Sequence, residues 1–182
     1  MVITLACSVA LGAEFVTVKV DDIGGSPRVR LSTHSVANPD TLQRELWTLR
    51  SDGTQGRYIE KQVVLNETAN ERLQFVVFNP PLLSRREALI RSRRIFNPST
   101  GAWHVRVCAE AGAAPTEQAI RVKAIESEWH FLPDGHGGTD VQYVTRVDFG
   151  FPSWVVAGFQ PQIALEALRE VITRAELSSI SP

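Results

Sequence analysis

Alternation of apolar and polar residues predicts a chain built mainly from β-strands. Runs rich in β-branched and aromatic residues predict strands at residues 15–20, 28–36, 56–66, 72–79, 85–96, 101–109, 120–132 and 139–149. Short connections that carry Pro, Gly, Asn or Asp separate most of these runs. Such connections favour antiparallel hairpins, because parallel neighbours need a long crossover.

Two stretches follow a helical period instead. In the first, Asn38 is expected to cap a helix that begins with Pro39 and buries Leu42, Leu46 and Leu49. The second stretch runs from Pro161, and its apolar stripe consists of Ile163, Ala164, Ala167, Leu168, Val171 and Ala175. The opposite face is expected to carry Gln162, Glu166, Arg169, Glu170 and Arg174. Many strands followed by a late amphipathic helix indicate an α+β domain, in which the helix covers the sheet.

Composition narrows the class of protein without naming a partner. A chain of 182 residues with 43% hydrophobic and 21% charged residues is expected to form one folded domain. The net charge of −1 gives no general attraction to nucleic acid or anionic lipid, and basic residues do not interleave with aromatic ones, so no nucleic-acid partner is predicted. Cys7 and Cys108 are too few for a disulfide framework and are expected to be buried thiols. No feature of the sequence indicates an oligomeric state.

The first residues of the chain leave its location open. Residues 1–13 have the small apolar character of a secretory signal but lack its positively charged start. A short helix or strand packed on the domain is the alternative. We expect a cytoplasmic protein, with export or a periplasmic location as the other interpretation.

Four passages of the chain resemble bacterial START-type lipid-transfer domains, within the helix-grip superfamily that also holds polyketide cyclases. The passages are residues 16–19 with 25–27, residues 80–87, residues 120–121 with 129–133 and 138–141, and residues 152–154 with 167–169. Arg86 and Glu87 match the Arg-Asp pair of the family, with Glu in place of the usual Asp. The resemblance implies an α+β helix-grip fold, in which a curved antiparallel sheet wraps around the long C-terminal helix. It places this domain at residues 15–176, between an apolar segment at 1–14 and a tail at 177–182.

The same resemblance implies a cavity for a hydrophobic ligand between sheet and helix. The residues expected to face the ligand are Phe75, Val77, Trp103, Val105, Val107, Trp129, Phe131, Tyr143, Thr145, Val147, Phe159, Ile163 and Ala167. Tyr143, Thr145 and Ser127 would hold one hydroxyl of a lipid or sterol-like ligand, or would bond to backbone or water instead. The predicted function is therefore non-enzymatic lipid binding or lipid transfer.

The residues alone leave two other functions open. One is a cyclase or aromatase that uses Tyr143 or an inward arginine as acid or base. The other is an interaction domain whose apolar side chains fill the core completely.

The histidines and the remaining charged residues give little indication of a catalytic site. The four histidines, His34, His104, His130 and His136, show no metal-ligand spacing, so neither a metal nor a cofactor is predicted. Glu126 and Glu128 share one strand face, but alternation with Trp129 turns that face to solvent. Five arginines crowd one predicted strand: Arg85, Arg86, Arg91, Arg93 and Arg94. They would make transient contact with a phosphate head or membrane, or lie in solvent balanced by Glu60 and Glu110.

Overall fold

The computed structural model of the chain describes residues 10–11, 14–23, 26–49, 58–79, 84–111, 119–151, 155–156 and 158–180. Most of the expected N-terminal segment, with Cys7, lies outside these residues. So do residues 80–83 and 152–154, which carried part of the resemblance.

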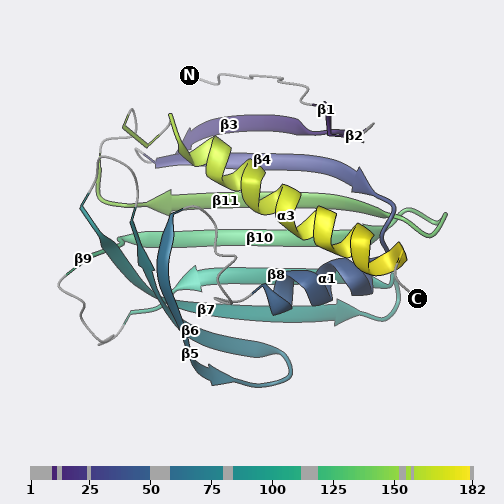
Figure 1. The fold of residues 1–182 in the computed structure, drawn as a ribbon, viewed down its shortest axis with the longest axis horizontal. Coiled ribbons are helices and arrows are strands. Elements are labelled where there is room, and N and C mark those ends of the chain that lie inside the picture. Colours follow the sequence, from purple (N-terminus) through teal and green to yellow (C-terminus); the bar gives the residue numbers. More distant parts are fainter. Residues whose placement is uncertain are drawn as a thin grey trace.

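One large antiparallel sheet forms the body of the molecule (Figure 1). Its strand order is β3-β4-β11-β10-β8-β7-β6-β5, and the short strand β9 pairs in parallel with β7. The bounds are β3 Thr17–Ile23, β4 Ser26–Ser35, β5 Ile59–Glu67, β6 Glu71–Phe78, β7 Arg86–Asn97, β8 Ala102–Ala109, β9 Ile120–Arg121, β10 Ala124–Pro133 and β11 Thr139–Asp148. A separate pair is formed by β1 Ala10–Leu11 and β2 Glu14–Phe15.

The strand expected at residues 120–132 is broken in two. Val122 donates its backbone N–H to Glu87, whereas the N–H of Lys123 goes to Asp148. The chain therefore changes partners between these two residues, from β7 to β11. Alternation could not reveal this break, because Ile120 and Ile125 are apolar on both sides of it.

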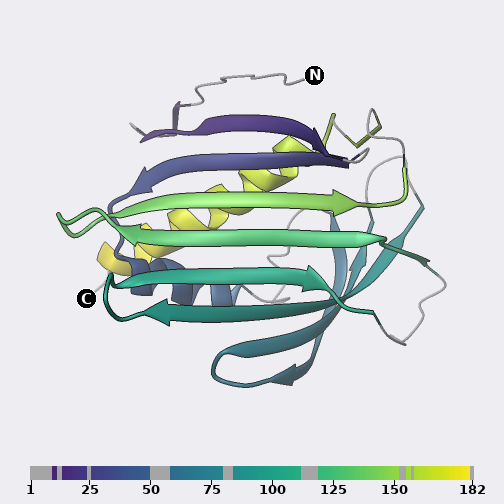
Figure 2. The same ribbon diagram turned by 180° about the vertical axis from the view of Figure 1, so that it is seen from behind.

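The helices α1 (Pro39–Thr48) and α3 (Gln160–Ile180) lie on one face of the sheet, and the view from behind shows the other face without them (Figure 2). The first helix, α1 (Pro39–Thr48), begins as predicted, since Asn38 accepts a 2.9 Å hydrogen bond from the N–H of Thr41. The second helix, α3 (Gln160–Ile180), crosses the sheet obliquely and contacts α1 and β4. It continues to Ile180, so most of the tail expected at 177–182 is helical.

The main core lies beneath the helices. Leu168 of α3 is fully buried there with Leu42 of α1 and with inward residues of β4 and β11, such as Leu31 and Val141. A second cluster of buried residues lies toward the start of α3 and includes Ile125 and Phe149. The predicted α+β helix-grip architecture is confirmed. Among the described residues, no helix combines the length and apolarity needed to cross a bilayer.

Candidate functional site

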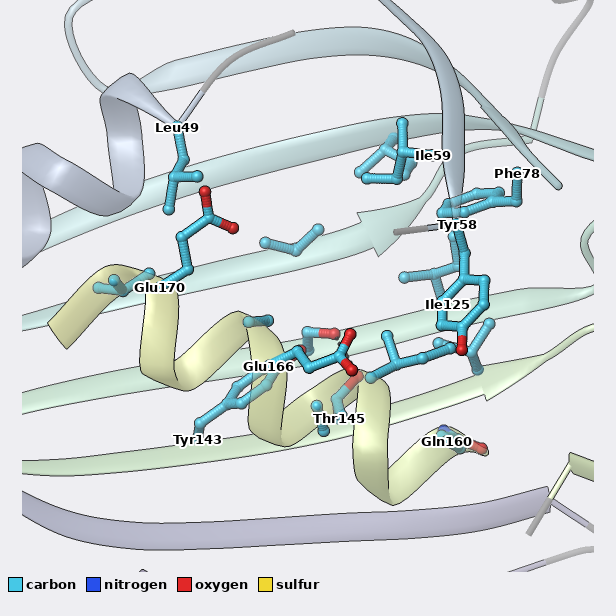
Figure 3. A pocket seen from close by; sticks show the side chains of 18 of the residues that line it. Leu49, Tyr58, Ile59, Phe78, Ile125, Tyr143, Thr145, Gln160, Glu166 and Glu170 are labelled. Atoms are coloured by element: carbon cyan, nitrogen blue, oxygen red, sulfur yellow. Dashed lines mark hydrogen bonds between the residues drawn. The ribbon is translucent and has the colours of Figure 1, made fainter. Parts of the chain in front are cut away.

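A cavity of about 310 Å³ lies between α3 and the inner face of the sheet (Figure 3). Its walls come from the ends of α1 and β5, from β6, β7, β8, β10 and β11, and from the first half of α3. Most of the lining side chains are aliphatic or aromatic. They are Leu46, Leu49, Tyr58, Ile59, Gln62, Phe78, Ile90, Val107, Ile125, Ser127, Trp129, Tyr143, Thr145, Val147, Phe149, Gln160, Ile163, Ala164, Glu166, Ala167, Glu170 and Val171.

Part of the residue set expected at a ligand site does line this cavity. Its members there are Val107, Trp129, Tyr143, Thr145, Val147, Ile163 and Ala167. Strand register explains the grouping, because Ser127 of β10 pairs with Thr145 of β11 on one side and with Val107 of β8 on the other, and Trp129 pairs with Tyr143. The Trp129 and Tyr143 rings stack with centroids 3.8 Å apart and form a flat aromatic wall.

Other expected residues face the helices but pack in the core beside the cavity. Val105 and Phe131 are buried in the cluster under the two helices. Trp103 donates its indole N–H to Asp40 in the first turn of α1, at 2.6 Å. Phe159 packs against Phe149, with ring centroids 6.1 Å apart.

Phe75 and Val77 lie on the other face of β6, so the prediction that they face the cavity is incorrect. Phe78 lines the cavity, and side chains alternate along a strand, which turns Phe75 and Val77 away from it. Both are nevertheless buried, in a small cluster with Leu89 of β7. Because both faces of β6 carry buried apolar residues, hydrophobic alternation did not identify the inner one.

Two hydroxyl groups in the cavity wall satisfy one another, and a third lies beside them. Ser127 and Thr145 share a 2.7 Å hydrogen bond across β10 and β11, and both lie near the phenol of Tyr143. Burial raises the pKa of Tyr143, and its two hydroxyl neighbours only partly oppose this effect. The phenol is therefore protonated at neutral pH, which makes it a poor general base.

Three polar residues of α3 that were not predicted also line the cavity. Gln160 is 3% exposed, and neither its amide nitrogen nor its amide oxygen has a hydrogen-bond partner. Glu166 and Glu170 were expected on the solvent face but project from α3 at the cavity (Figure 3). Helical spacing contains the missed signal, since 163, 166, 167 and 170 share one face of a helix.

The charge that lines the cavity is entirely negative among the described residues. No Lys, Arg or His is part of its lining, whereas two carboxylates are. Glu166 accepts a long 3.4 Å bond from Gln162, and Glu170 accepts a 3.1 Å bond from Arg174 one helical turn away. An anionic ligand would therefore find no cation among these residues.

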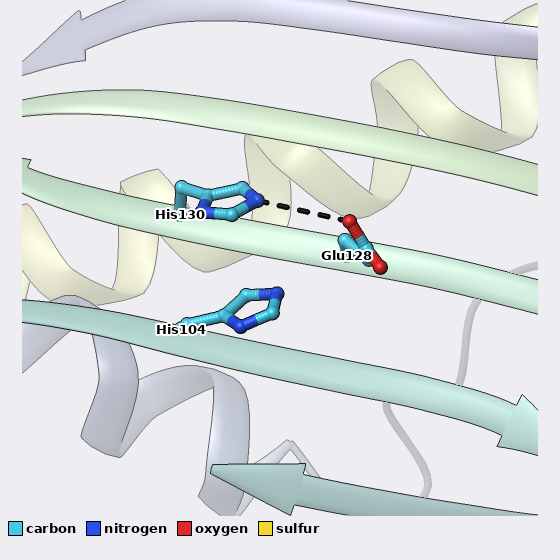
Figure 4. Close-up of side chains that lie close together, drawn as sticks. All are labelled: His104, Glu128 and His130. Carbon is cyan, nitrogen blue, oxygen red and sulfur yellow. Dashed lines mark ion pairs between the residues drawn. The ribbon is translucent and has the colours of Figure 1, made fainter. Parts of the chain in front are cut away.

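A second polar group lies on the opposite face of the sheet (Figure 4). His104 of β8 and His130 of β10 are cross-strand partners whose rings stack with centroids 4.3 Å apart, and Glu128 lies 3.8 Å from His130. Their ligand atoms all fall within 4.8 Å of one another, a grouping that the sequence spacing did not predict. Burial, with a smaller effect of His130, lowers the pKa of His104.

The surroundings of this histidine group oppose a divalent cation. Arg106 lies 3.8 Å from Glu128, and Arg28, Arg30 and Arg146 line the adjacent surface hollow. Their positive charges disfavour a further cation, and His130 and Arg106 already contact the carboxylate. We interpret the group as a surface ion-pair cluster and assign no metal to it.

Three of the five arginines, Arg85 just before β7 and Arg91 and Arg93 within it, are balanced by glutamates. Arg85 pairs with Glu60 at 2.5 Å, Arg91 pairs with Glu110 and Glu71, and Arg93 pairs with Glu71 at 2.8 Å. This matches the interpretation of solvent arginines neutralised by nearby carboxylates.

Arg86 differs from its neighbours because it is buried. It donates from Nε to the carbonyl of Phe149 at 3.1 Å and from Nη1 to that of Ser84 at 3.0 Å. Burial lowers the pKa of its guanidinium. Arg86 therefore ties β7 to the end of β11 and does not line the cavity.

Comparisons with known proteins give a clear result for the fold. No family model matches the sequence, and no curated protein matches it. A STAR-related lipid transfer protein from Xanthomonas axonopodis is similar in structure, with a TM-score of 0.76 at 19% identity over 92% of this chain and 96% of that one. Human STARD10 gives 0.71 at 13% identity over 92% and 71% of the two chains, and human StAR-related lipid transfer protein 5 gives 0.70 at 12% over 92% and 84%. The chain therefore has the START-type helix-grip fold.

Proposed function

We propose that this START-type domain binds a hydrophobic ligand in the cavity between α3 and the sheet, and that it acts as a carrier of lipid. The observation that carries the proposal is the apolar cavity itself, because a domain of this size would otherwise close its core tightly. Its volume of about 310 Å³ is at the lower end of the range for small-molecule sites. Proteins named for lipid transfer share the fold, which supports the same class of ligand.

Apolar burial would supply most of the affinity. A ligand that removes on the order of 300 Å² of apolar surface from water gains roughly 7 kcal/mol at about 25 cal/mol per Å². Loss of ligand freedom on binding subtracts several kcal/mol from this gain. The remainder corresponds to weak or moderate affinity, which suits a ligand that must also be released.

The state of Tyr143 in the cavity wall supports a carrier over a cyclase. Its phenol is protonated at neutral pH, and no arginine lines the described part of the cavity. The acid or base expected for a cyclase, Tyr143 or an inward arginine, therefore has little support.

Filling the cavity tests the proposal. Ala167 lines the cavity in the middle of α3, so Ala167→Phe should occupy the space that a ligand needs. Thr173→Phe adds a comparable aromatic ring to an exposed position of the same helix and serves as the matched control. Native mass spectrometry of protein purified from a lipid-rich bacterial host should find a bound hydrophobic molecule in the wild type and in Thr173→Phe.

The Ala167→Phe variant should have lost this molecule while keeping a cooperative thermal transition. The carrier proposal would be wrong if wild-type protein neither retains a lipid nor takes up hexadecane or hexadecanol from solution. It would also be wrong if Ala167→Phe binds as well as the control.

A further inference from the structure

Gln160 is a buried polar side chain that lacks a partner. It is the first residue of α3, it is 3% exposed, and both atoms of its amide lack hydrogen bonds. A buried polar group left unpaired destabilises a protein, so native structures almost always supply a partner. Because Gln160 lines the cavity, the missing partner is expected to be a group inside the cavity.

The chemistry of the amide restricts that partner. A glutamine amide offers two donor hydrogens on nitrogen and an acceptor oxygen. A group that both donates and accepts, such as a hydroxyl or another amide, can satisfy both ends together. A carboxylate can only accept, so it would leave the Gln160 oxygen unpaired.

The other polar groups of the cavity do not compete for this role. Ser127 and Thr145 already share a 2.7 Å hydrogen bond, and the Tyr143 phenol lies beside them, so these hydroxyls have neighbours within the wall to bond with. Among the described residues that line the cavity, Gln160 is the one whose side-chain amide is buried and makes no hydrogen bond at either atom.

The charges of the cavity point in the same direction. Glu166 and Glu170 project from the face of α3 that starts with Gln160 and Ile163, and the described lining contains no cation. Arg174 lies 3.1 Å from Glu170 but is not part of the lining. A further negative charge placed beside these two carboxylates would be repelled and would lose part of its hydration without compensation.

Resting on the proposed function, we infer that the ligand is a lipid with an uncharged hydroxyl or amide head. Gln160 binds this head, and Glu166 and Glu170 exclude fatty acids and other anionic lipids. Selectivity thus comes from one unpaired amide and two carboxylates, whereas the aromatic and aliphatic wall accepts any apolar tail of suitable size.

A set of probes with one tail and different heads tests this inference. Hexadecanol, hexadecanamide, hexadecanoate, hexadecylamine and hexadecane are titrated against the full chain, with displacement of a fluorescent apolar dye as the readout. The alcohol and the amide should bind at least about 10-fold more tightly than hexadecanoate, a difference of roughly 1.4 kcal/mol. Hexadecylamine separates a hydrogen bond to Gln160 from simple attraction to Glu166 and Glu170, and an amine that binds more than about 3-fold tighter than the alcohol would overturn the inference.

Three variants assign the selectivity to residues. Gln160→Met keeps the length of the side chain and should weaken hexadecanol about 5- to 10-fold while leaving hexadecane unchanged. The double change Glu166→Gln with Glu170→Gln should bring hexadecanoate to within about 3-fold of hexadecanol. Glu126→Gln, on the outer face of the sheet, is the matched charge control and should leave the ratio as in the wild type.

The outcomes separate the inference from the proposed function. Hexadecanoate that binds as tightly as hexadecanol would overturn the inference, as would Gln160→Met that weakens hexadecanol and hexadecane equally. The proposed function would still stand in both cases. If no probe binds, hexadecane included, the proposed function fails and the inference fails with it.

Discussion

Two substitutions on the same helix distinguish a cavity wall from a packed core. Leu168 of α3 is fully buried, whereas Ile163 of the same helix is partly exposed and faces the cavity. Changing either residue to alanine removes about three carbon atoms, worth roughly 2.4 kcal/mol when the side chain is fully buried. At Leu168 an unfilled space adds to this loss, so Leu168→Ala should lower the free energy of unfolding by about 3–5 kcal/mol.

Ile163→Ala should cost much less, about 1 kcal/mol, because part of the isoleucine surface already faces empty space. Urea unfolding followed by tryptophan fluorescence measures both values, and Leu168→Ala should melt roughly 6–20 °C below the wild type. Ligand affinity should show the reverse order, with the larger loss in Ile163→Ala. Equal destabilisation by the two changes would show that Ile163 is packed as tightly as Leu168 and that no cavity lies beside it.

Two further predictions concern polar contacts. Thr145→Val removes the hydrogen bond to the buried hydroxyl of Ser127 and should lower the free energy of unfolding by about 1–3 kcal/mol. Thr33→Val is the control, because the Thr33 hydroxyl makes only a 3.5 Å contact, and it should change the free energy of unfolding by less than about 0.5 kcal/mol. Equal losses in the two variants would contradict the buried Ser127–Thr145 bond. Hydrogen bonds from His34 and, to a smaller extent, from the backbone N–H groups of His136 and Gly138 lower the pKa of Asp134 from 3.8 to about 2, so their stabilising effect is complete above pH 3.8 and disappears as the pH falls through 2. Asp134→Asn should therefore reduce the change of the urea midpoint between pH 4 and pH 2. An unchanged pH dependence of the midpoint would refute this assignment.

Much of the architecture could be predicted from local patterns. Alternation located the main strands because most of them have one buried and one exposed face, as in β11, where Val141, Tyr143 and Thr145 are buried and Gln142 is exposed. Asn38 and Pro39 located the start of α1, because a cap and a fixed φ act within a few residues. These signals depend on nearest neighbours, so the sequence contains them in full.

Local patterns failed where a strand is buried on both faces, or where a site depends on residues that are far apart in the sequence. Both faces of β6 are buried, so Phe75 and Val77 were assigned to the cavity although Phe78 faces it. The grouping of His104 with Glu128 and His130 requires the register between β8 and β10, which spacing along the chain does not specify.

The sequence by itself determined the α+β class, most of the strands, the N-terminal cap of α1 and the apolar stripe of the last helix. These features follow from the period of the backbone and from short-range hydrogen bonds. Only the tertiary structure decided that α3 crosses the sheet obliquely, so that Leu168 seals a core while Ile163, Glu166 and Glu170 border an open space. The physical reason is that a cavity is set by the angle and distance between two packed surfaces, and neither quantity is encoded in the pattern of one surface alone.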